Sequence, residues 1–196
     1  MKIVVLTSGG IDSGLMISMF TKEGHEVLPL HINYGHLAEA KEWESCKKIC
    51  NKFSLEPYCM DINGFGKLPS GLTNKELDVY DKAFLPTRNL TFLTMGAAYA
   101  YSKSCNVVAI GLLANPIFPD QTKEFVEKAQ ISISEALGTQ IYFLTPLIDL
   151  DKRDVLKLAE DFELSKITYY CHSGGEKPCG VCISCRERIA ADKYMN

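Results

Sequence analysis

The feature that most constrains the fold is the stretch of residues 2–17, KIVVLTSGGIDSGLMI, in which an apolar segment meets a helix through a glycine-rich turn. Residues 3–6 are apolar without polar alternation, which is typical of a strand covered on both faces of a parallel sheet. Gly9 and Gly10 allow backbone conformations in which successive N–H groups converge on an anion, and the start of the helix adds partial positive charge. The turn also carries two hydroxyl groups and a carboxylate that can bind phosphate, cap the helix or hold a magnesium ion: Ser8, Ser13 and Asp12. We therefore expect a phosphate site here.

This turn matches neither of the common phosphate-binding motifs, because it lacks the lysine of a Walker A loop and the three-glycine spacing of a dinucleotide fingerprint. The pattern S-G-G-x-D-S after a strand instead resembles the pyrophosphate loop of the N-type ATP pyrophosphatases, which cleave ATP to AMP and pyrophosphate while adenylating an acceptor. The resemblance predicts that the nucleotide is bound by Thr7, Ser8, Gly9, Gly10, Ile11, Asp12 and Ser13. The simpler interpretation is a glycine-rich turn in which a Ser or Asp side chain caps the helix.

Predicted strands and helices alternate along the rest of the chain. Apolar runs predict further strands at residues 26–33, 56–62, 106–112 and 140–147. Apolar residues three or four apart predict helices at 37–53, from Thr87 toward Lys103, at 125–137 and, as the last one, from near Asp151. The alternation predicts an α/β fold with a doubly wound, mostly parallel five-stranded sheet. In such sheets ligands collect beyond the carboxyl ends of the strands.

Composition narrows the class of protein. The chain has 196 residues and a formal net charge of -3, which fits one domain over residues 1–196 and argues against nonspecific nucleic-acid binding. We therefore expect a small-molecule partner and no nucleic acid. No apolar run approaches 18 residues and no charged segment precedes an apolar one at the start, so we expect a cytoplasmic protein without membrane attachment. Eight cysteines without an export signal indicate thiols and metal ligands.

The least regular part of the chain is residues 63–87, where glycine and proline interrupt every period. A loop of this length is usually a lid, a binding loop or disordered. It ends in Pro86-Thr87-Arg88-Asn89, which predicts Thr87 as the N-cap of the following helix. Arg88 then lies at the start of that helix, where it could serve phosphate or simply face solvent.

The cysteines of the tail, residues 167–196, form a second strong pattern, C-x7-C-x2-C-x2-C, made by Cys171, Cys179, Cys182 and Cys185. Four thiolates can form a closed tetrahedral site, the usual arrangement for structural zinc. An iron–sulfur cluster is the main competitor, although the C-P that ends a ferredoxin run is absent. Cys46 and Cys50 lie one turn apart on an apolar helix face, and we expect them, with Cys59, to be ordinary core thiols.

Together the two patterns resemble the 7-cyano-7-deazaguanine synthase family over most of the chain. The matching positions are residues 8–13, His31, Asn33, His36, residues 86–93, Gly111, residues 145–147, Lys152 and the four tail cysteines. The resemblance implies an adenine nucleotide alpha hydrolase-like fold, a homodimer, and ATP, Mg²⁺ and structural Zn²⁺ as cofactors. The implied chemistry is adenylation of 7-carboxy-7-deazaguanine, attack by ammonia to give an amide, and a second ATP-driven step that dehydrates the amide to a nitrile.

The resemblance also implies roles for individual residues. Asp12, Ser13, Arg88 and Lys152 are the expected catalytic residues, and His31 and Gly111 join the turn in binding nucleotide. His36, Arg88, Phe118 and Asp120 are expected at the base, with Phe118 offering a stacking face and Asp120 a carboxylate for the guanine-like edge.

The chain departs from the family in two segments. Residues 118–122 read F-P-D-Q-T in place of Y-P-D-C-R, and residues 33–36 read N-Y-G-H in place of N-Q-R-H. ATP activation is therefore better supported than the acceptor. An enzyme that stops at the amide, or that joins the activated deazapurine to another amine such as a peptide terminus, stays open. Two rival classes of protein also stay open: a tRNA-modifying adenylating enzyme and a noncatalytic nucleotide-binding module.

Overall fold

A five-stranded sheet, parallel throughout, organises the computed structural model, which describes residues 1–193. The strands are β1 (Lys2–Leu6), β2 (Glu26–Asn33), β3 (Tyr58–Asp61), β4 (Val107–Ala109) and β5 (Tyr142–Leu144). Their order in the sheet is β3-β2-β1-β4-β5, so the chain moves outward from β1 first on one side and then on the other. This reversal beside β1 leaves room for a ligand at the carboxyl ends of β1 and β4.

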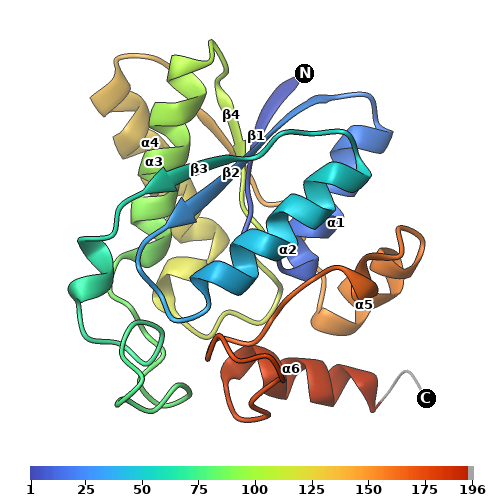
Figure 1. The fold of residues 1–196 in the computed structure, drawn as a ribbon. Helices are drawn as coiled ribbons and strands as arrows, with labels where there is room; N and C mark the ends of the chain where they lie inside the picture. Colours follow the sequence, from blue (N-terminus) through green and yellow to red (C-terminus); the bar gives the residue numbers. More distant parts are fainter. Residues whose placement is uncertain (194–196) are drawn as a thin grey trace.

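Helices cover both faces of the sheet (Figure 1). On one face α1 (Ile11–Lys22) and α2 (Glu39–Lys52) pack against β1 and β2, with α5 (Lys152–Glu160) beside α1. On the other face lie α3 (Arg88–Ser102) and α4 (Lys123–Leu137). The prediction of a doubly wound α/β fold is confirmed.

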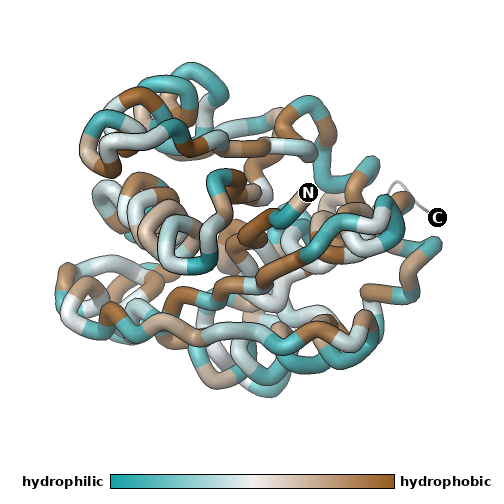
Figure 2. The backbone as a smooth tube through the Cα atoms, turned by 90° about the horizontal axis from the view of Figure 1, so that it is seen from above, coloured by the Kyte–Doolittle hydropathy of each residue, from teal (hydrophilic) through white to brown (hydrophobic). Residues whose placement is uncertain are grey.

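The core lies where the central strand meets both helical layers. Ile3, Val4 and Val5 of β1 are fully buried, as are Leu15 and Ile17 of α1. Each such aliphatic side chain contributes about 1.5–3 kcal/mol by leaving water. Hydrophobic segments accordingly run through the middle of the molecule, and hydrophilic segments are frequent at its edge (Figure 2).

The predicted core thiols differ in burial. Cys46 and Cys50 are fully buried, which confirms their structural role, whereas Cys59 is only half-buried.

Several elements differ from their predicted bounds. β4 ends at Ala109, so Ile110 and Leu112 lie beyond the strand, yet both are buried. A run of apolar residues cannot distinguish a strand from a buried loop, which explains why the predicted strand was too long. A helix not predicted from the sequence, α6 (Ile183–Asp192), follows the third cysteine of the tail, Cys182, whose side chain caps it.

The irregular segment after β3 is folded. It contains a 3-10 turn, η1 (Phe65–Lys67), and then doubles back so that Gly71 N donates a hydrogen bond of 2.7 Å to Lys82 O. Its buried side chains, Leu72, Ala83 and Leu85, pack around Tyr34 at the end of β2. This segment and α6 both lie at the end of the molecule toward which the strands point (Figure 1). Among the described helices, none has the length and apolar character needed to cross a membrane.

Candidate active site

The turn between β1 and α1 has the geometry of an anion-binding loop. Gly9 has a φ of +73°, and a Cβ there would lie 2.3 Å from the carbonyl oxygen of Glu42 in α2, so both the backbone conformation and the packing require glycine. Ser45 Oγ donates a hydrogen bond of 2.6 Å to the Gly9 carbonyl, and Tyr169 N donates another of 3.1 Å. The loop is thus held from behind by α2 and by the segment that leads to the tail cysteines.

The hydroxyl groups of this loop form hydrogen bonds within the loop, including one from Gly10 N to Ser8 Oγ at 3.3 Å, and leave the first turn of the helix uncapped. Thr7 Oγ1 donates to Ser13 Oγ at 3.2 Å, and Ser13 Oγ donates to the Gly10 carbonyl at 3.1 Å. The N-cap residue of α1 is Gly10, and no side chain accepts a hydrogen bond from the first turn. The simpler interpretation, a Ser or Asp cap, is therefore wrong. The first-turn N–H groups remain available to an anion.

Asp12 and Lys152 meet across the site. Lys152, the first residue of α5, places its Nζ 2.8 Å from each carboxylate oxygen of Asp12. Glu187 of α6 lies near this pair; burial raises the pKa of Glu187, while Lys152 opposes that shift. Gly111 packs against the same region, where an added Cβ would lie 3.3 Å from Asp12 Cβ.

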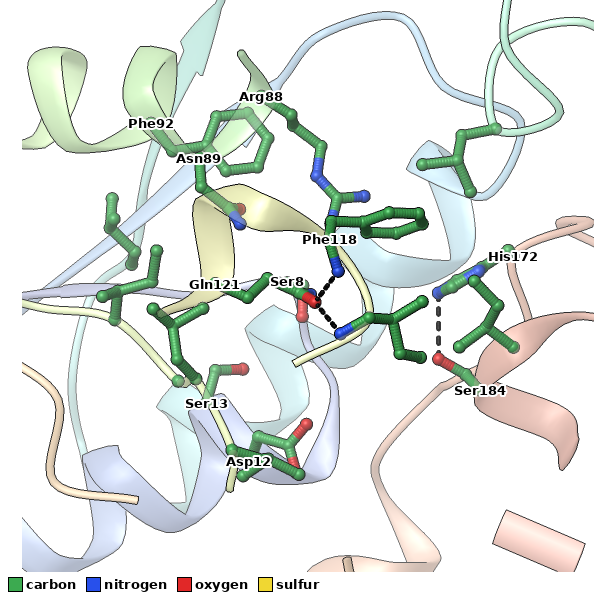
Figure 3. A pocket seen from close by; sticks show the side chains of 18 of the residues that line it. Ser8, Asp12, Ser13, Arg88, Asn89, Phe92, Phe118, Gln121, His172 and Ser184 are labelled. Atoms are coloured by element: carbon green, nitrogen blue, oxygen red, sulfur yellow. Dashed lines mark hydrogen bonds between the residues drawn. The ribbon is translucent and has the colours of Figure 1, made fainter. Parts of the chain in front are cut away.

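A cavity of about 280 Å³ extends from this loop across the carboxyl ends of the strands. In Figure 3, Asp12 and Ser13 lie on one side, Arg88, Asn89 and Phe92 of α3 on another, and His172 and Ser184 of the tail on a third. The predicted site residues that line it are Thr7, Ser8, Asp12, Ser13, His31, His36, Arg88, Gly111, Phe118 and Lys152. Gly10 and Ile11 line a smaller adjoining hollow, whereas Gly9 packs against the backbone of α2.

Arg88 and Phe118 form the wall opposite the phosphate loop (Figure 3). The Phe118 ring packs against the ring of Phe84 in the irregular segment, with the two ring centroids 5.2 Å apart. Gln121 Oε1 accepts hydrogen bonds from the backbone N–H groups of Ile117 and Phe118 at 2.8 and 2.9 Å, which fixes the turn that carries the ring. An aromatic face beside an arginine suits a planar anionic ligand.

Asp120 does not lie where the prediction placed it. Its side chain is buried, is absent from the cavity lining and accepts a hydrogen bond of 3.0 Å from Asn89 N at the start of α3. The Asn89 side chain returns a bond of 3.0 Å to the Asp120 carbonyl. Thr87 precedes α3 in a left-handed conformation, with φ of 60°, and its side chain does not cap the helix. The capping predicted for Thr87 is thus provided by Asp120, which corrects both assignments.

Two histidines and two glutamates form a chain of polar contacts, the histidine–glutamate chain, which starts at Thr7 before the glycine-rich turn and ends at Glu42 in the cavity lining. His31 Nδ1 donates to the Thr7 carbonyl at 2.9 Å, and His31 Nε2 donates to Glu39 Oε2 at 3.0 Å. The same Glu39 oxygen lies 3.6 Å from His36 Nδ1, and His36 Nε2 donates to Glu42 Oε2 at 2.9 Å. His36 stacks on Tyr34 with ring centroids 4.1 Å apart.

The residues of the histidine–glutamate chain stabilise one another's charged forms although they are buried. Burial alone would lower the pKa of His31, but the hydrogen bond and charge of Glu39 outweigh it and raise that pKa. Burial would likewise raise the pKa of Glu42, yet His36 outweighs it and holds the pKa low. The sequence indicated the two histidines but not Glu39 and Glu42. Their signal was the spacing of three between His36, Glu39 and Glu42, which brings them together at the start of α2.

The tail supplies a wall that the sequence did not predict. His172 lines the cavity, its Nε2 lies 2.9 Å from Ser184 Oγ, and burial is the main reason that its pKa is lowered to about 4. The interpretation of His172 as a loop residue rather than a metal ligand agrees with this placement. Ile183, Ser184 and Glu187 of α6 join it in the lining.

The four tail cysteines converge on one point. The sulfur atoms of Cys171, Cys179, Cys182 and Cys185 all lie within 4.8 Å of one another. Backbone N–H groups support them, since Cys179 N donates to Cys171 Sγ at 3.2 Å and Cys185 N donates to Cys182 Sγ at 3.4 Å. Four thiols at this spacing fit a metal ion with a closed set of ligands.

Comparison with known proteins agrees with this geometry. The family model described as "Queuosine biosynthesis protein QueC" matches residues 2–195. The 7-cyano-7-deazaguanine synthase of Acetivibrio thermocellus is 37% identical over 97% of this chain and 92% of its own length. That of Caldicellulosiruptor bescii is 34% identical over 100% of this chain and 94% of its own.

A solved structure shares the fold at lower identity. A 4-thiouridine synthetase in an RNA complex with bound ATP superposes with a TM-score of 0.58 at 16% identity, over 98% of this chain and 50% of its own. With a matching family model over nearly every residue and relatives above 30% identity at full length, the chain belongs to the queuosine biosynthesis protein QueC family.

Proposed function

We propose that the chain is an ATP-dependent ligase that converts 7-carboxy-7-deazaguanine and ammonia, through the amide, into 7-cyano-7-deazaguanine. The observation that carries this proposal is one cavity that joins the uncapped start of α1 to the wall formed by Arg88 and Phe118. Such a cavity can hold a triphosphate at one side and a planar carboxylated base at the other. The names of the relatives supply the identity of the base.

The first step is activation of the carboxylate. A carboxylate repels nucleophiles, so its oxygen attacks the α-phosphate of ATP, and pyrophosphate leaves with the electron pair of the broken bond. We assign pyrophosphate to Ser8, Ser13 and the backbone N–H groups around Gly9 and Gly10. These donors face the charge that develops on the leaving group, which is where preorganised dipoles lower a barrier.

Two charged groups complete the activation step. Asp12 would hold Mg²⁺, which neutralises phosphate charge when bound, and its carboxylate is a suitable hard oxygen ligand. Lys152, which pairs with Asp12 at 2.8 Å, would then turn to phosphate, with Arg88 on the opposite side. Each group neutralises the other until the nucleotide arrives.

The later steps use the same cavity. Ammonia attacks the mixed anhydride, AMP leaves with the electron pair of the broken C–O bond, and nitrogen loses a proton, which gives the amide. In a second activation the amide oxygen attacks the α-phosphate of another ATP and pyrophosphate leaves. AMP then leaves with the former amide oxygen, and two protons leave nitrogen to give the nitrile. Phe118 would stack on the base, and His31 and Gly111 would border the nucleotide. We further propose that the four cysteines hold Zn²⁺ as a structural ion, that residues 1–196 form one domain with its metal-binding tail, and that two copies associate.

The test is the release of pyrophosphate and AMP from ATP with and without 7-carboxy-7-deazaguanine, followed by mass analysis of the product. We expect release to depend on the base, and the product made with ammonium to be the nitrile. Formation of ADP would reject the activation step, whereas accumulation of the amide would reject only the second one. Failure of the base to stimulate pyrophosphate release at any ammonium concentration would reject the substrate.

A further inference from the structure

The second hollow beside the phosphate loop has a volume of about 80 Å³, whereas a water molecule in the liquid occupies roughly 30 Å³. The hollow therefore has room for a molecule of the size of ammonia. Its lining is Ser8, Gly10, Ile11, Asp12, Glu42, Lys152, Thr168, Tyr169, Tyr170, His172, Ser184 and Arg188. Six of these residues also line the large cavity: Ser8, Asp12, Glu42, Lys152, His172 and Ser184.

Glu42 lines both the small hollow and the large cavity, and one of its two carboxylate oxygens already accepts a hydrogen bond. Its Oε2 accepts the hydrogen bond of 2.9 Å from His36, and within residues 1–193 no hydrogen bond reaches its Oε1. The side chain keeps 15% of its surface exposed although it lies beneath the cavity. His36 is itself held in place by stacking on Tyr34, so the carboxylate is fixed in position.

The remaining charges of the small hollow have partners of their own. Lys152 is paired with Asp12, and Arg188 with Asp192 of the same helix at 3.0 Å. Tyr169 and Tyr170 also line the hollow. A carboxylate oxygen that accepts no hydrogen bond attracts a small cation with N–H groups.

We propose that Glu42 binds ammonium in the small hollow and delivers it to the acyl adenylate in the large one. This inference rests on the proposed function and assigns the site of its nitrogen donor. The lysine ammonium group has a usual pKa of about 10.4 and is almost wholly protonated near neutral pH. Free ammonia behaves in the same way, so the form that a carboxylate can bind, the ammonium cation, is the abundant one.

Two protons leave the nitrogen during the reaction. One N–H bond of ammonium breaks and its electron pair becomes the nucleophilic lone pair, the C–N bond forms, and the bond from carbon to the phosphate oxygen breaks with its electrons on AMP. The second proton leaves as the amide forms, and both protons pass to solvent. Neither transfer needs an oxidant or a reductant.

The test compares Glu42→Gln with Glu44→Gln, which changes an exposed glutamate of the same helix. Loss of a charge-assisted hydrogen bond should raise the KM for ammonium about 10- to 100-fold in Glu42→Gln, with a smaller change in kcat, and leave Glu44→Gln unchanged. Hydroxylamine, which is mainly uncharged near neutral pH, should form hydroxamate equally well with all three proteins.

A third assay separates this inference from the proposed function. Exchange of labelled pyrophosphate into ATP requires 7-carboxy-7-deazaguanine but no ammonium. Exchange in Glu42→Gln at the wild-type rate, with a raised KM for ammonium, supports the site. An unchanged KM overturns it, and so does loss of exchange, which would place Glu42 in the nucleotide step or show that the hollow serves pyrophosphate. Absence of exchange in the wild-type protein would reject the proposed function and this site with it.

Discussion

At the scale of single residues, the charged groups of the candidate site are paired with one another. Asp12 holds Lys152, Glu42 holds His36, and Glu39 lies between His31 and His36. His31 has an acceptor at each ring nitrogen, the Thr7 carbonyl and the Glu39 carboxylate, which favours the imidazolium form. The charged side chains near the glycine-rich turn therefore neutralise one another within the protein. A bound ligand would replace one of the partners in such a pair.

The Asp12 pair gives the first prediction. Asp12→Asn keeps the shape of the side chain but removes the magnesium ligand and the partner of Lys152, so turnover should fall at least about 100-fold. The measurement is pyrophosphate release in the presence of the base, with thermal unfolding as the check on folding. Turnover within tenfold of wild type in a folded variant would remove Asp12 from the mechanism.

The His31 pair gives a prediction for stability against pH. Because the folded-state pKa of His31 is raised above its usual value of about 6.5, its stabilising effect is complete below pH 6.5 and is lost as pH rises through the higher folded-state value. Glu39→Gln removes the charge that raises this pKa. Urea unfolding should therefore show a larger loss of stability for Glu39→Gln at pH 6 than at pH 9, with Glu44→Gln showing no such trend. An equal loss at both pH values would contradict the ion pair.

At the scale of elements, the position of α3 decides where Arg88 lies. The helix starts where Asp120 accepts from Asn89 N, and η2 (Pro119–Gln121) carries both Asp120 and the turn that holds Phe118. The two hydrogen bonds between Asn89 and Asp120 thus fix the spacing between Arg88 and Phe118. The cap that matters comes from 31 residues further along the chain.

Replacing each candidate cap tests this arrangement. Asp120→Ala should cost about 0.5–2 kcal/mol of stability, as loss of an N-cap does, and should weaken binding of the base by displacing Arg88. Thr87→Gly should cost nothing or stabilise, because glycine adopts the left-handed backbone without strain. Denaturant unfolding measures both, and a larger cost for Thr87→Gly than for Asp120→Ala would reverse the assignment.

Local patterns of the sequence were sufficient for the fold and for part of the site. β2 occupies its predicted residues 26–33, and the phosphate turn with Lys152, Arg88, Phe118 and His36 gathers at one cavity. The failures have two causes. The overlong β4 came from an apolar run that continues past the strand, and the misplaced Asp120 depends on a contact between distant segments. Asp120 was expected at the base, but its carboxylate accepts a hydrogen bond from the start of α3 instead. Glu42 was not among the expected site residues, although it lines the cavity.

At the scale of the whole molecule, two segments far apart in sequence close the cavity together. Arg186 of α6 stacks on Tyr80 of the irregular segment, 3.8 Å from the ring centroid, and Val79 packs against the tail cysteines. Gly174 fits against Leu37 so closely that a Cβ would lie 2.1 Å from its carbonyl oxygen. The tail with the four cysteines is therefore joined both to the irregular segment and to the start of α2.

Metal content and stability should consequently change together. We expect one zinc ion per chain, and Cys182→Ser should lose it and lower the melting temperature, because structural zinc contributes on the order of 10 kcal/mol to folding a small unit. Elemental analysis and thermal unfolding are the measurements. Iron with acid-labile sulfide in anaerobically prepared protein would contradict zinc, and retention of zinc with unchanged melting would contradict the ligand set.

The position of the tail has a consequence for synthesis of the protein. The fifth strand ends at Leu144, whereas the cavity is completed only by Glu187, 43 residues later in translation. At roughly 5–20 residues per second, about 2–9 s separate synthesis of the fifth strand from synthesis of this last wall. Tyr169, whose backbone N–H bonds to the Gly9 carbonyl, is also made within that interval. A nascent chain at this stage has its strands but lacks the support of the glycine-rich turn and the last wall of the cavity. A chain truncated between these residues would therefore keep the five strands but leave the cavity open on the side of α6.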